Sequence, residues 1–461
     1  MLQDTIAIVL AAGAGTRMKS AVAKPLHPIL GLPLSVYPAL AALEAGVRRI
    51  VVVVGHQRDE VKAALSALLP PDRVDFAVQA DPRGTGDAVV AASPYIHNAG
   101  YVLILNGDVP GIETSTLTTL AAATQQAQAL VGLVTCRLNH PRTYGRIVRG
   151  HDGAVIRIVE DKDATEEQRL IHEVNVGIYL ADSTHTLDTL RRTGTNNAQG
   201  ELYLTAIVDE AARLDRPPVT VMVPEGLNTW GINDRSELAR VEDAMRARIN
   251  DHWMRSGVTM HNPASIFIET NVSLGTDTEL GPNVRLAGRT TIGNNCKIDQ
   301  GCVITNSQIE GSVHVKPYSI ITETHVGPAA EIGPFAHLRP GTTLGERTKI
   351  GNFVETKKAK LHTGAKANHL AYLGDCDIGQ ETNIGAGTIT CNYDGKHKYQ
   401  TTIESHVFIG SDTQLVAPVH VGKGAYVGAG TTVTQDVPAG ALAISRTPQK
   451  NIEGWVARKK G

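Results

Sequence analysis

The sequence predicts an α/β domain followed by a parallel β-helix, with one long helix between them. Two observations carry this prediction. Apolar runs alternate with helix-like stretches in the first half of the chain, which is typical of βαβ units and a mainly parallel sheet. Branched aliphatic residues recur every six positions in roughly the C-terminal two-fifths, which is neither a helical nor an ordinary strand period. The domain boundaries that we expect are 1–232, 233–256 and 257–461.

Composition and charge exclude several classes of protein. The 461 residues carry a net charge of −2 and show no basic patch interleaved with aromatic residues, so we expect no nucleic-acid partner. Five cysteines without a Cys-x-x-Cys spacing argue against a disulfide framework and a zinc site, and favour a reducing, cytoplasmic location. The apolar run at 6–12 reads as a buried strand rather than a signal peptide, and no stretch is apolar enough to span a membrane.

The first apolar run, Ile6–Ala12, leads directly into a turn with glycines at 13 and 15. These glycines would let backbone N–H groups approach an anionic ligand, and Arg17 and Lys24 would add cations for phosphate oxygens. Alone this signal is weak, because the turn lacks the third glycine of a dinucleotide fingerprint and the Gly-Lys-Ser/Thr of a P-loop. Most short Gly-x-Gly turns bind nothing.

Further buried strands are predicted at Ile50–Val54 and Tyr101–Leu105. Asp108 follows the second of these strands, at the edge where open α/β sheets bind their ligands. Taken singly, Asp108 is more simply interpreted as a turn aspartate.

The connecting helix is predicted to begin at Asp234. Asp234 would cap it, and Glu237 completes a capping-box pattern. Because an asparagine beside a helix start more often caps than binds a metal, Asn233 has a capping interpretation as well. One apolar stripe follows at helical spacing, formed by Leu238, Val241, Met245, Ile249 and Trp253.

The six-residue repeat predicts short parallel strands that each send one aliphatic side chain inward before the chain turns a corner. A single coil cannot bury its apolar edge, so stacked neighbours must supply the core. Parallel crossovers are overwhelmingly right-handed, so periodicity alone favours a right-handed coil. The repeat runs through Leu274, Leu280, Leu286, Ile292, Ile298 and Ile304, through Ile332, Leu338, Leu344 and Ile350, and through Ile403, Ile409, Leu415, Val421, Val427 and Val433.

Function is expected where this repeat is interrupted, because stacked coils make the rest of the β-helix rigid. The interval 350–378 is not a multiple of six, and the interval 384–403 is one residue longer than three periods. Residues 391–400 are predicted to form an extruded loop, with turn chemistry from Asp394-Gly395. By itself, His369 in the first interval is more simply a solvated surface histidine.

Several motifs taken together resemble the sugar nucleotidyltransferases, and their combination is far more specific than any one of them. In the first domain these motifs are Leu10-Ala11-Ala12-Gly13-x-Gly15-Thr16-Arg17-Met18, Lys24, Gly84-Thr85-Gly86 and Gly107-Asp108-Val109-Pro110. Further motifs are similar to those of the bacterial bifunctional uridyltransferases and acetyltransferases, namely Tyr144-Gly145-Arg146, Glu173-Val174-Asn175-x-Gly177 and residues 159–164, 196–201, 351–358, 369–375 and 383–395.

The resemblance implies a Rossmann-like domain that transfers uridylyl from UTP to N-acetylglucosamine 1-phosphate and releases pyrophosphate. Asp108 and Asn233 would hold Mg²⁺, which prefers oxygen ligands and offsets phosphate charge during in-line attack on the α-phosphorus. Arg17 and Lys24 would assist this reaction. The nucleotide would contact Leu10, Ala11, Ala12, Gly13, Lys24, Gln79, Gly84 and Thr85, and the sugar would contact Gly145, Glu160, Asn175 and Asn233. The chain departs from the family pattern at Ala23-Lys24-Pro25, Asn106 and Asp87.

The resemblance also implies a left-handed β-helix that transfers acetyl from acetyl-CoA to glucosamine 1-phosphate. His369 would be the base, because the aminosugar arrives largely as an ammonium and an imidazole with a pKa near ~6.5 can take its proton. Glu355 would orient that ring, Asn392 would steady the amine, and the backbone N–H of Ser411 would meet the developing oxyanion. The aminosugar phosphate would contact Arg339, Lys357, Tyr372 and Asn383, and acetyl-CoA would contact Ala386, Asn392, Tyr393, Ser411, Ala429 and Arg446.

By the same resemblance the chain would form a homotrimer, with each acetyl site completed by a neighbour. Three other interpretations stay open. The β-helix could be purely regulatory, as in relatives that make ADP-glucose, but such a domain has no reason to assemble His369, Asn392 and an extruded loop. A non-enzymatic scaffold would have no need of Arg17 and Asp108. A solenoid carbonic anhydrase would place two zinc histidines five residues apart, and no two histidines between 262 and 446 are so spaced.

Overall fold

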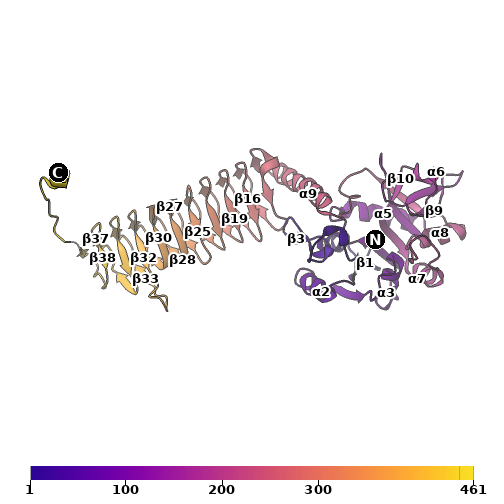
Figure 1. Ribbon diagram of the computed structural model, residues 1–461, viewed down its shortest axis with the longest axis horizontal. Helices are drawn as coiled ribbons and strands as arrows, with labels where there is room; N and C mark the ends of the chain where they lie inside the picture. Colours follow the sequence, from indigo (N-terminus) through magenta and orange to yellow (C-terminus); the bar gives the residue numbers. More distant parts are fainter. Residues whose placement is uncertain (1, 446, 460–461) are drawn as a thin grey trace. The chain divides into compact units, whose positions relative to one another are not determined.

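The computed structural model describes residues 2–445 and 447–459 and divides into two compact units, Met1–Met245 and Arg246–Gly461 (Figure 1). The division falls inside helix α9 (Arg235–Arg255). The expected domain boundaries at 232/233 and 256/257 stay predictions. Across the described ranges, none of the helices is both long enough and apolar enough to cross a bilayer.

The first unit is built on a mixed sheet whose strand order is β11-β7-β10-β6-β1-β4-β5. Strand β1 lies parallel to β4 and β6, as predicted, whereas β10 runs antiparallel to both β6 and β7. Strand β8 (Arg146–Arg149) pairs with β10 on one side and with β9 (Val155–Val159) on the other. The strands of the main path are β1 (Thr5–Ala11), β4 (Arg49–Val54), β5 (Val74–Val78), β6 (Tyr101–Asn106), β7 (Val131–Arg137), β10 (Glu173–Asp182) and β11 (Val219–Val223).

Both faces of this sheet are buried. Alternate side chains of β1 enter two different apolar clusters, Ala7 and Val9 in one and Ile6 and Ile8 in the other. That explains why β1 is a continuous apolar run rather than an alternating one. The helices of this unit before α9 are α1 (Val36–Glu44), α2 (Arg58–Ser66), α3 (Thr85–Ala91), α4 (Ser93–Ile96), α5 (Thr114–Gln126), α6 (Glu166–Arg169), α7 (Ser183–Arg192) and α8 (Ala206–Arg213).

Helix α9 begins with the predicted cap. The Glu237 backbone N–H donates to Asp234 Oδ1 at 2.8 Å, and the Asn233 backbone N–H donates to Glu237 Oε2 at 2.8 Å. The reciprocal bond of the capping box therefore comes from the residue before Asp234. Because Asp234 supplies the capping oxygen, the side chain of Asn233 is available for contacts inside the first unit.

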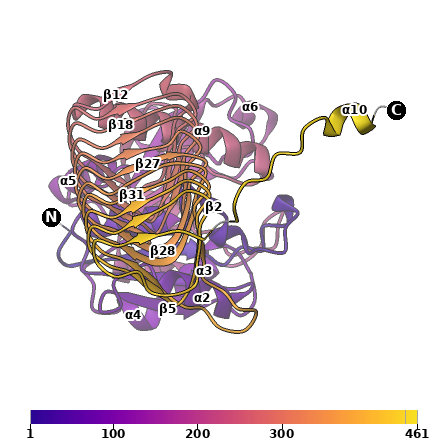
Figure 2. The ribbon, with the colours of Figure 1, turned by 90° about the vertical axis from the view of Figure 1, so that its left-hand side faces the viewer.

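The second unit is a parallel β-helix of stacked coils (Figure 2). Strands three apart in sequence pair in parallel, as β15 (Glu279–Leu280) does with β18 (Lys297–Ile298), so each coil contributes three strands. The strands nearest the interruptions of the repeat are β27 (Lys349–Asn352), β28 (Glu355–Leu361), β29 (Lys366–His369), β30 (Tyr372–Ile378), β31 (Asn383–Ile384), β32 (Ile389–Cys391), β33 (Thr401–Ile403) and β34 (Phe408–Ile409).

The aliphatic positions of the six-residue repeat are buried in one continuous core, which confirms the prediction. Leu274, near the start of the β-helix, is only half-buried and packs against that core. The register also explains why the repeat breaks after Ile304. Ile304 pairs with Ile321, so this coil is seventeen residues long, whereas the pairing of Ile409 with Val427 spans eighteen. A coil that is one residue shorter shifts every later position by one.

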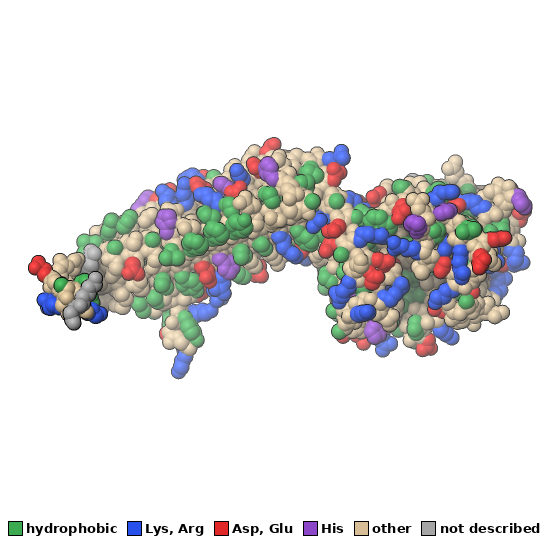
Figure 3. All heavy atoms as spheres, turned by 45° about the horizontal axis from the view of Figure 1, so that its top comes forward, with side chains coloured by type: hydrophobic (Ala, Val, Ile, Leu, Met, Phe, Trp, Pro, Cys, Tyr) green, Lys and Arg blue, Asp and Glu red, His purple; other side chains and the backbone are tan. Residues whose placement is uncertain are grey.

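The predicted extruded loop is confirmed between β32 and β33. Its tip turns at Gly395, which has a φ of 98°, and Asp394 Oδ1 accepts hydrogen bonds from the backbone N–H groups of Lys396 and His397 at 2.7 Å. Figure 3 shows the loop standing out from the β-helix with basic side chains at its end.

Replacing Ile409 with alanine is expected to lower the free energy of unfolding by about 2 to 5 kcal/mol. Ile409 is fully buried and pairs with Ile384 and Val427 in the neighbouring coils, so no single coil can move to fill the cavity. Chemical denaturation measures the effect. Thr432→Ala is the control, because the Thr432 side chain is exposed and its loss should change stability by less than about 0.5 kcal/mol. An unfolding curve unaltered by Ile409→Ala would show that this side chain does not support the core.

Asp209→Asn is expected to stabilise the protein at pH 7 but not at pH 4. Burial raises the pKa of Asp209 to about 6, whereas an aspartate in an unfolded chain titrates near ~3.9. The unfolded chain loses its proton first, so the stability that this group contributes declines as the pH rises from ~4 to about 6.

An asparagine oxygen can still accept the 3.2 Å hydrogen bond from the Ile158 backbone N–H, so we expect a gain of about 1 to 2 kcal/mol at pH 7. Thermal melts at the two pH values measure it, and the exposed Asp188→Asn is the control. Equal effects of Asp209→Asn on stability at both pH values would contradict a raised pKa for Asp209 in the folded protein.

Candidate active sites

A cleft of about 340 Å³ opens at the carboxyl ends of β1 and β6 in the first unit. Gly107 makes this junction possible, because a Cβ there would lie 2.7 Å from the Leu10 carbonyl oxygen. Asp108 therefore lies beside the glycine turn that follows β1. The cleft is lined by every residue expected to hold the nucleotide, namely Leu10, Ala11, Ala12, Gly13, Lys24, Gln79, Gly84 and Thr85.

Gln79 is buried on one wall of the cleft and is held from two sides. Its Nε2 donates to the Gly84 carbonyl oxygen at 3.0 Å and to Asp87 Oδ2 at 2.8 Å. Both amide hydrogens are thereby used within the protein, so a ligand can meet only the side-chain oxygen. Asp87, where the chain departs from the family pattern, thus has a structural role in orienting Gln79.

The cationic and metal-ligand candidates form one cluster at the edge of the cleft. Lys24 Nζ lies 2.5 Å from Asp108 Oδ2 and 3.2 Å from Asn233 Oδ1, and the Arg17 guanidinium donates to the same Asn233 oxygen at 2.9 Å. Arg17 is in η1 (Thr16–Met18) and Lys24 begins η2 (Lys24–Leu26).

Two hard oxygens, from Asp108 and Asn233, converge on a single cationic atom in this cluster. Such a pair fits Mg²⁺, which usually takes one or two protein oxygens and completes its shell with water and phosphate. Among the residues that the structure describes, no group of three or more His, Cys, Asp or Glu gathers as a metal site. Asn233 contributes its side chain to this cluster and its backbone N–H to the helix cap, so the metal and capping interpretations are compatible.

Three of the four residues expected to hold the sugar lie together. The Asn175 backbone N–H donates to the Gly145 carbonyl oxygen at 2.9 Å, and a Cβ on Gly145 would lie 3.5 Å from Glu160 Oε2. Burial is the main cause that raises the pKa of Glu160, and the negative charges of Asp163 and Glu201 raise this pKa further. The fourth residue, Asn233, lies with Asp108 instead.

Sequence reasoning missed a second cavity of about 380 Å³ that shares Asn106, Asp108 and Asn233 with this region. Tyr144 and Trp230 also line it. The Tyr144 hydroxyl donates to the Thr229 carbonyl oxygen at 2.7 Å. Tyr144 stands inside a family-like motif, and that was the one signal that could have drawn attention to it.

In the β-helix, His369 lies at the end of β29, where the chain turns between two sheets. Its partner is Asn352, one coil earlier, with 3.0 Å between His369 Nδ1 and Asn352 Oδ1. Glu355, which was expected to orient the ring, instead accepts a 2.6 Å hydrogen bond from Arg339.

Basic groups gather around Lys357. Lys357 lies in β28, and the adjacent Lys398 of the extruded loop is the main cause that lowers the pKa of Lys357, with a further contribution from Arg339. Tyr372 pairs in register with Glu355 on the next coil. Clustered cations of this kind suit a phosphate.

Asn392 begins the extruded loop and is buried, with its Nδ2 2.5 Å from Asp375 Oδ2. Gly374 leaves room for this arrangement, because a Cβ there would lie 2.6 Å from the Tyr372 hydroxyl and 2.8 Å from Asn392 Nδ2. Tyr393, further along the loop, is exposed.

Residues expected to contact acetyl-CoA stack at one corner of successive coils. The Ala386 carbonyl oxygen accepts from the backbone N–H of Asp412, and a Cβ on Gly410 would lie 2.5 Å from the Ala429 nitrogen. Ser411 is therefore placed between Ala386 and Ala429 along this corner. Asn383, in β31, belongs to a different sheet from Tyr372. Arg446 lies outside the described residues.

Comparison with known proteins matches each of the two units to a family of transferases. A model described as nucleotidyl transferase matches residues 6–227, and one described as bacterial transferase hexapeptide (six repeats) matches residues 271–306 and 400–435. The class defined by fold and sites is thus a nucleotidyltransferase joined to a hexapeptide-repeat transferase.

Curated relatives extend over the whole chain. The bifunctional protein GlmU of Geobacter sulfurreducens is 44% identical over 481 residues and covers 100% of both chains. The GlmU proteins of Sorangium cellulosum and of an Anaeromyxobacter species are 49% and 50% identical to this chain. Each alignment includes 98% of this chain, and it includes 96% of the Sorangium protein and 93% of the Anaeromyxobacter protein. The chain belongs to the GlmU family of bifunctional enzymes, which are both nucleotidyltransferases and acetyltransferases. Membership favours the two-site enzyme over a purely regulatory β-helix or a scaffold.

Proposed function

We propose that the chain makes UDP-N-acetylglucosamine by two transfers, one in each unit. The β-helix transfers acetyl from acetyl-CoA to glucosamine 1-phosphate. The first unit then transfers uridylyl from UTP to N-acetylglucosamine 1-phosphate and releases pyrophosphate. The observation that best supports this proposal is the convergence of the expected nucleotide residues on one cleft beside Lys24 and Asp108.

In the uridylyl transfer, the backbone of the glycine turn and Lys24 hold the triphosphate, and Gln79 offers its carbonyl oxygen to an N–H group of the base. Arg17 adds a second cation. Asp108 and Asn233 would hold Mg²⁺, which would offset the negative charge of the phosphate groups. Catalysis here is mostly positioning and charge stabilisation, because the sugar phosphate itself is the nucleophile.

In the acetyl transfer, Arg339 and Lys357 hold the phosphate of the aminosugar, and His369 accepts a proton from its ammonium group. The freed amine attacks the thioester carbon, and the backbone N–H of Ser411 donates to the oxyanion that forms. When the intermediate collapses, the carbon–sulfur bond breaks, the nitrogen gives up its extra proton to the departing sulfur, and coenzyme A leaves as a thiol. The small side chains of Ala386 and Ala429 leave space for its extended arm.

We further propose that the enzyme is a homotrimer that acts in the cytoplasm. Asn383 and Tyr372 lie on different sheets of one β-helix, so a neighbouring copy that supplies one of them would complete the sugar-phosphate site. Free cysteines, such as the buried Cys376, suit a reducing compartment.

One assay tests the two transfers separately. The enzyme is given glucosamine 1-phosphate, acetyl-CoA, UTP and Mg²⁺, and free thiol and pyrophosphate are measured independently. Both products should appear. With N-acetylglucosamine 1-phosphate and no acetyl-CoA, pyrophosphate should form without thiol. Thiol release without pyrophosphate in the complete mixture would refute the uridylyl transfer.

A further inference from the structure

The hydrogen-bond partner of His369 determines which of its ring nitrogens can act as a base. Asn352 Oδ1 faces Nδ1, and an amide oxygen only accepts hydrogen bonds. The proton of the neutral imidazole is therefore held on Nδ1, and Nε2 keeps its lone pair. The nitrogen that can accept a proton is the one turned away from Asn352.

Asn352 is itself held firmly by the β-helix. Residues 352 and 369 are direct register partners in β27 and β29, and the Asn352 carbonyl oxygen accepts the Leu370 backbone N–H at 3.0 Å. Gly351 allows the coils to come this close, because a Cβ there would lie 1.8 Å from the Asn368 carbonyl oxygen. The next residue, Phe353, stacks on Phe335 with 5.5 Å between ring centroids. The backbone on both sides of Asn352 is thus fixed.

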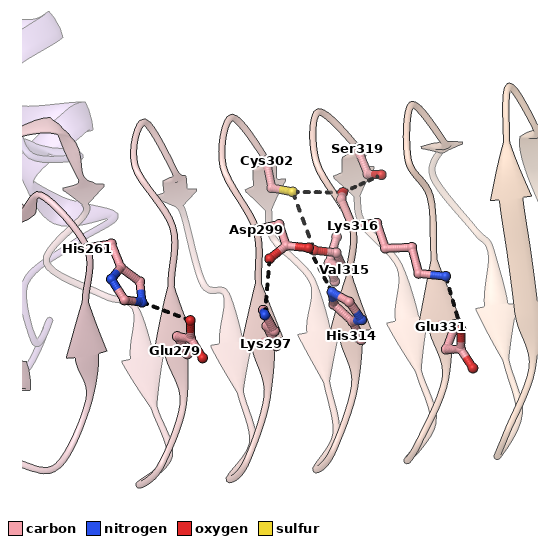
Figure 4. A network of polar contacts seen from close by, with 10 residues as sticks. All are labelled: His261, Glu279, Lys297, Asp299, Cys302, His314, Val315, Lys316, Ser319 and Glu331. Atoms are coloured by element: carbon pink, nitrogen blue, oxygen red, sulfur yellow. Dashed lines mark hydrogen bonds and ion pairs between the residues drawn. The ribbon is translucent and has the colours of Figure 1, made fainter.

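Other histidines of the β-helix have a different kind of partner. Figure 4 shows His261 against Glu279 and His314 against Asp299, at 2.8 and 2.7 Å. A carboxylate partner places a negative charge beside the ring. A neutral amide orients the ring without adding a charge. His369 differs from these histidines in having a neutral partner, which fixes the ring without adding a charge beside it.

We propose that Asn352 is the positioning residue of the acetyl-transfer site, and that it selects the tautomer of His369 whose Nε2 accepts the proton. This inference rests on the proposed role of His369 as the base. In this proposal Asn352 acts through the His369 ring and not through a contact of its own with a substrate. Its effect should therefore appear in kcat and in the pH profile rather than in substrate binding.

Two substitutions test the proposal in the full-length enzyme. Asn352→Ala should lower kcat for acetyl transfer by about tenfold to a hundredfold and change each KM by less than about threefold. Asn352→Asp should move the acid limb of the kcat profile to higher pH by about one unit, because a carboxylate would hold the imidazolium. Pyrophosphate formation should be unaffected by both. A wild-type kcat in Asn352→Ala, or an unmoved acid limb in Asn352→Asp, would overturn the proposal.

Two controls separate the possible failures. Asn294→Ala removes another asparagine of the β-helix, whose Oδ1 accepts the Thr276 backbone N–H at 3.0 Å, and should leave kcat unchanged. His369→Ala tests the base itself. If His369→Ala kept full acetyl transfer, the proposed function of His369 would fail. If only the Asn352 variants were unaffected, the positioning role alone would fail. Should Asn352→Ala not fold, Asn352→Asp still decides the question through its pH profile.

Discussion

Replacing His369 with alanine is expected to reduce acetyl transfer by about 10²-fold to 10⁴-fold, equivalent to roughly 3 to 5 kcal/mol of barrier. Without the imidazole, the aminosugar must lose its proton to water before its nitrogen can attack the thioester. Release of coenzyme A thiol from acetyl-CoA measures the effect. The rate of pyrophosphate formation from UTP and N-acetylglucosamine 1-phosphate should remain at the wild-type level, because His369 lies in the β-helix.

A matched control is His325→Ala, which removes a histidine that faces Glu310 at 3.0 Å in the same β-helix. It should not slow acetyl transfer. A His369→Ala enzyme with more than about a tenth of the wild-type rate would argue against a general base at this position.

Replacing Asp108 with alanine is expected to have the opposite selectivity. Pyrophosphate formation should fall by about 10²-fold or more, while thiol release persists. The Asp108 carboxylate and the Asn233 side-chain oxygen are the two groups expected to hold Mg²⁺. Loss of the carboxylate also removes the group that lies 2.5 Å from Lys24 Nζ. The Mg²⁺ concentration needed for half-maximal activity should rise, which a magnesium titration measures directly.

Exposed Asp81→Ala, near the same cleft, is the matched control and should leave the magnesium titration unchanged. If Asp108→Ala or His369→Ala abolished both activities in a folded protein, a division into two independent sites would be wrong. An Asp108→Ala enzyme with an unaltered magnesium requirement would exclude Asp108 as a ligand.

The β-helix could be predicted in detail because its signal is local. Each inward aliphatic side chain, such as Ile409, is encoded six positions from the next, and the core follows from stacking those positions. The end of the first run of the repeat at Ile304 could be located but not explained, since a seventeen-residue coil is recognised only when Ile304 is seen opposite Ile321. The mixed sheet was harder to predict. The direction of β10 depends on its pairing with β6 and β7, and strand hydrophobicity carries no direction.

The residues of the candidate sites were recognised from motifs, but their partners were not. Glu355 stands in the motif at 351–358 and was expected to contact His369, yet it binds Arg339. Asn352 stands in the same motif without an assigned role, and it faces the ring. Both contacts join neighbouring coils, and spacing along the chain does not show which side chain of one coil meets which of the next.

The sequence by itself determined that this protein has an α/β unit with a glycine-rich turn after its first strand and a β-helix of six-residue repeats, because hydrophobic period and turn residues are properties of short segments. Only the tertiary structure decided which polar groups meet. Lys24 reaches Asp108 across 84 positions and Asn233 across 209, and His369 reaches Asn352 across 17. Such contacts depend on strand order and coil register, which arise when distant segments pack together.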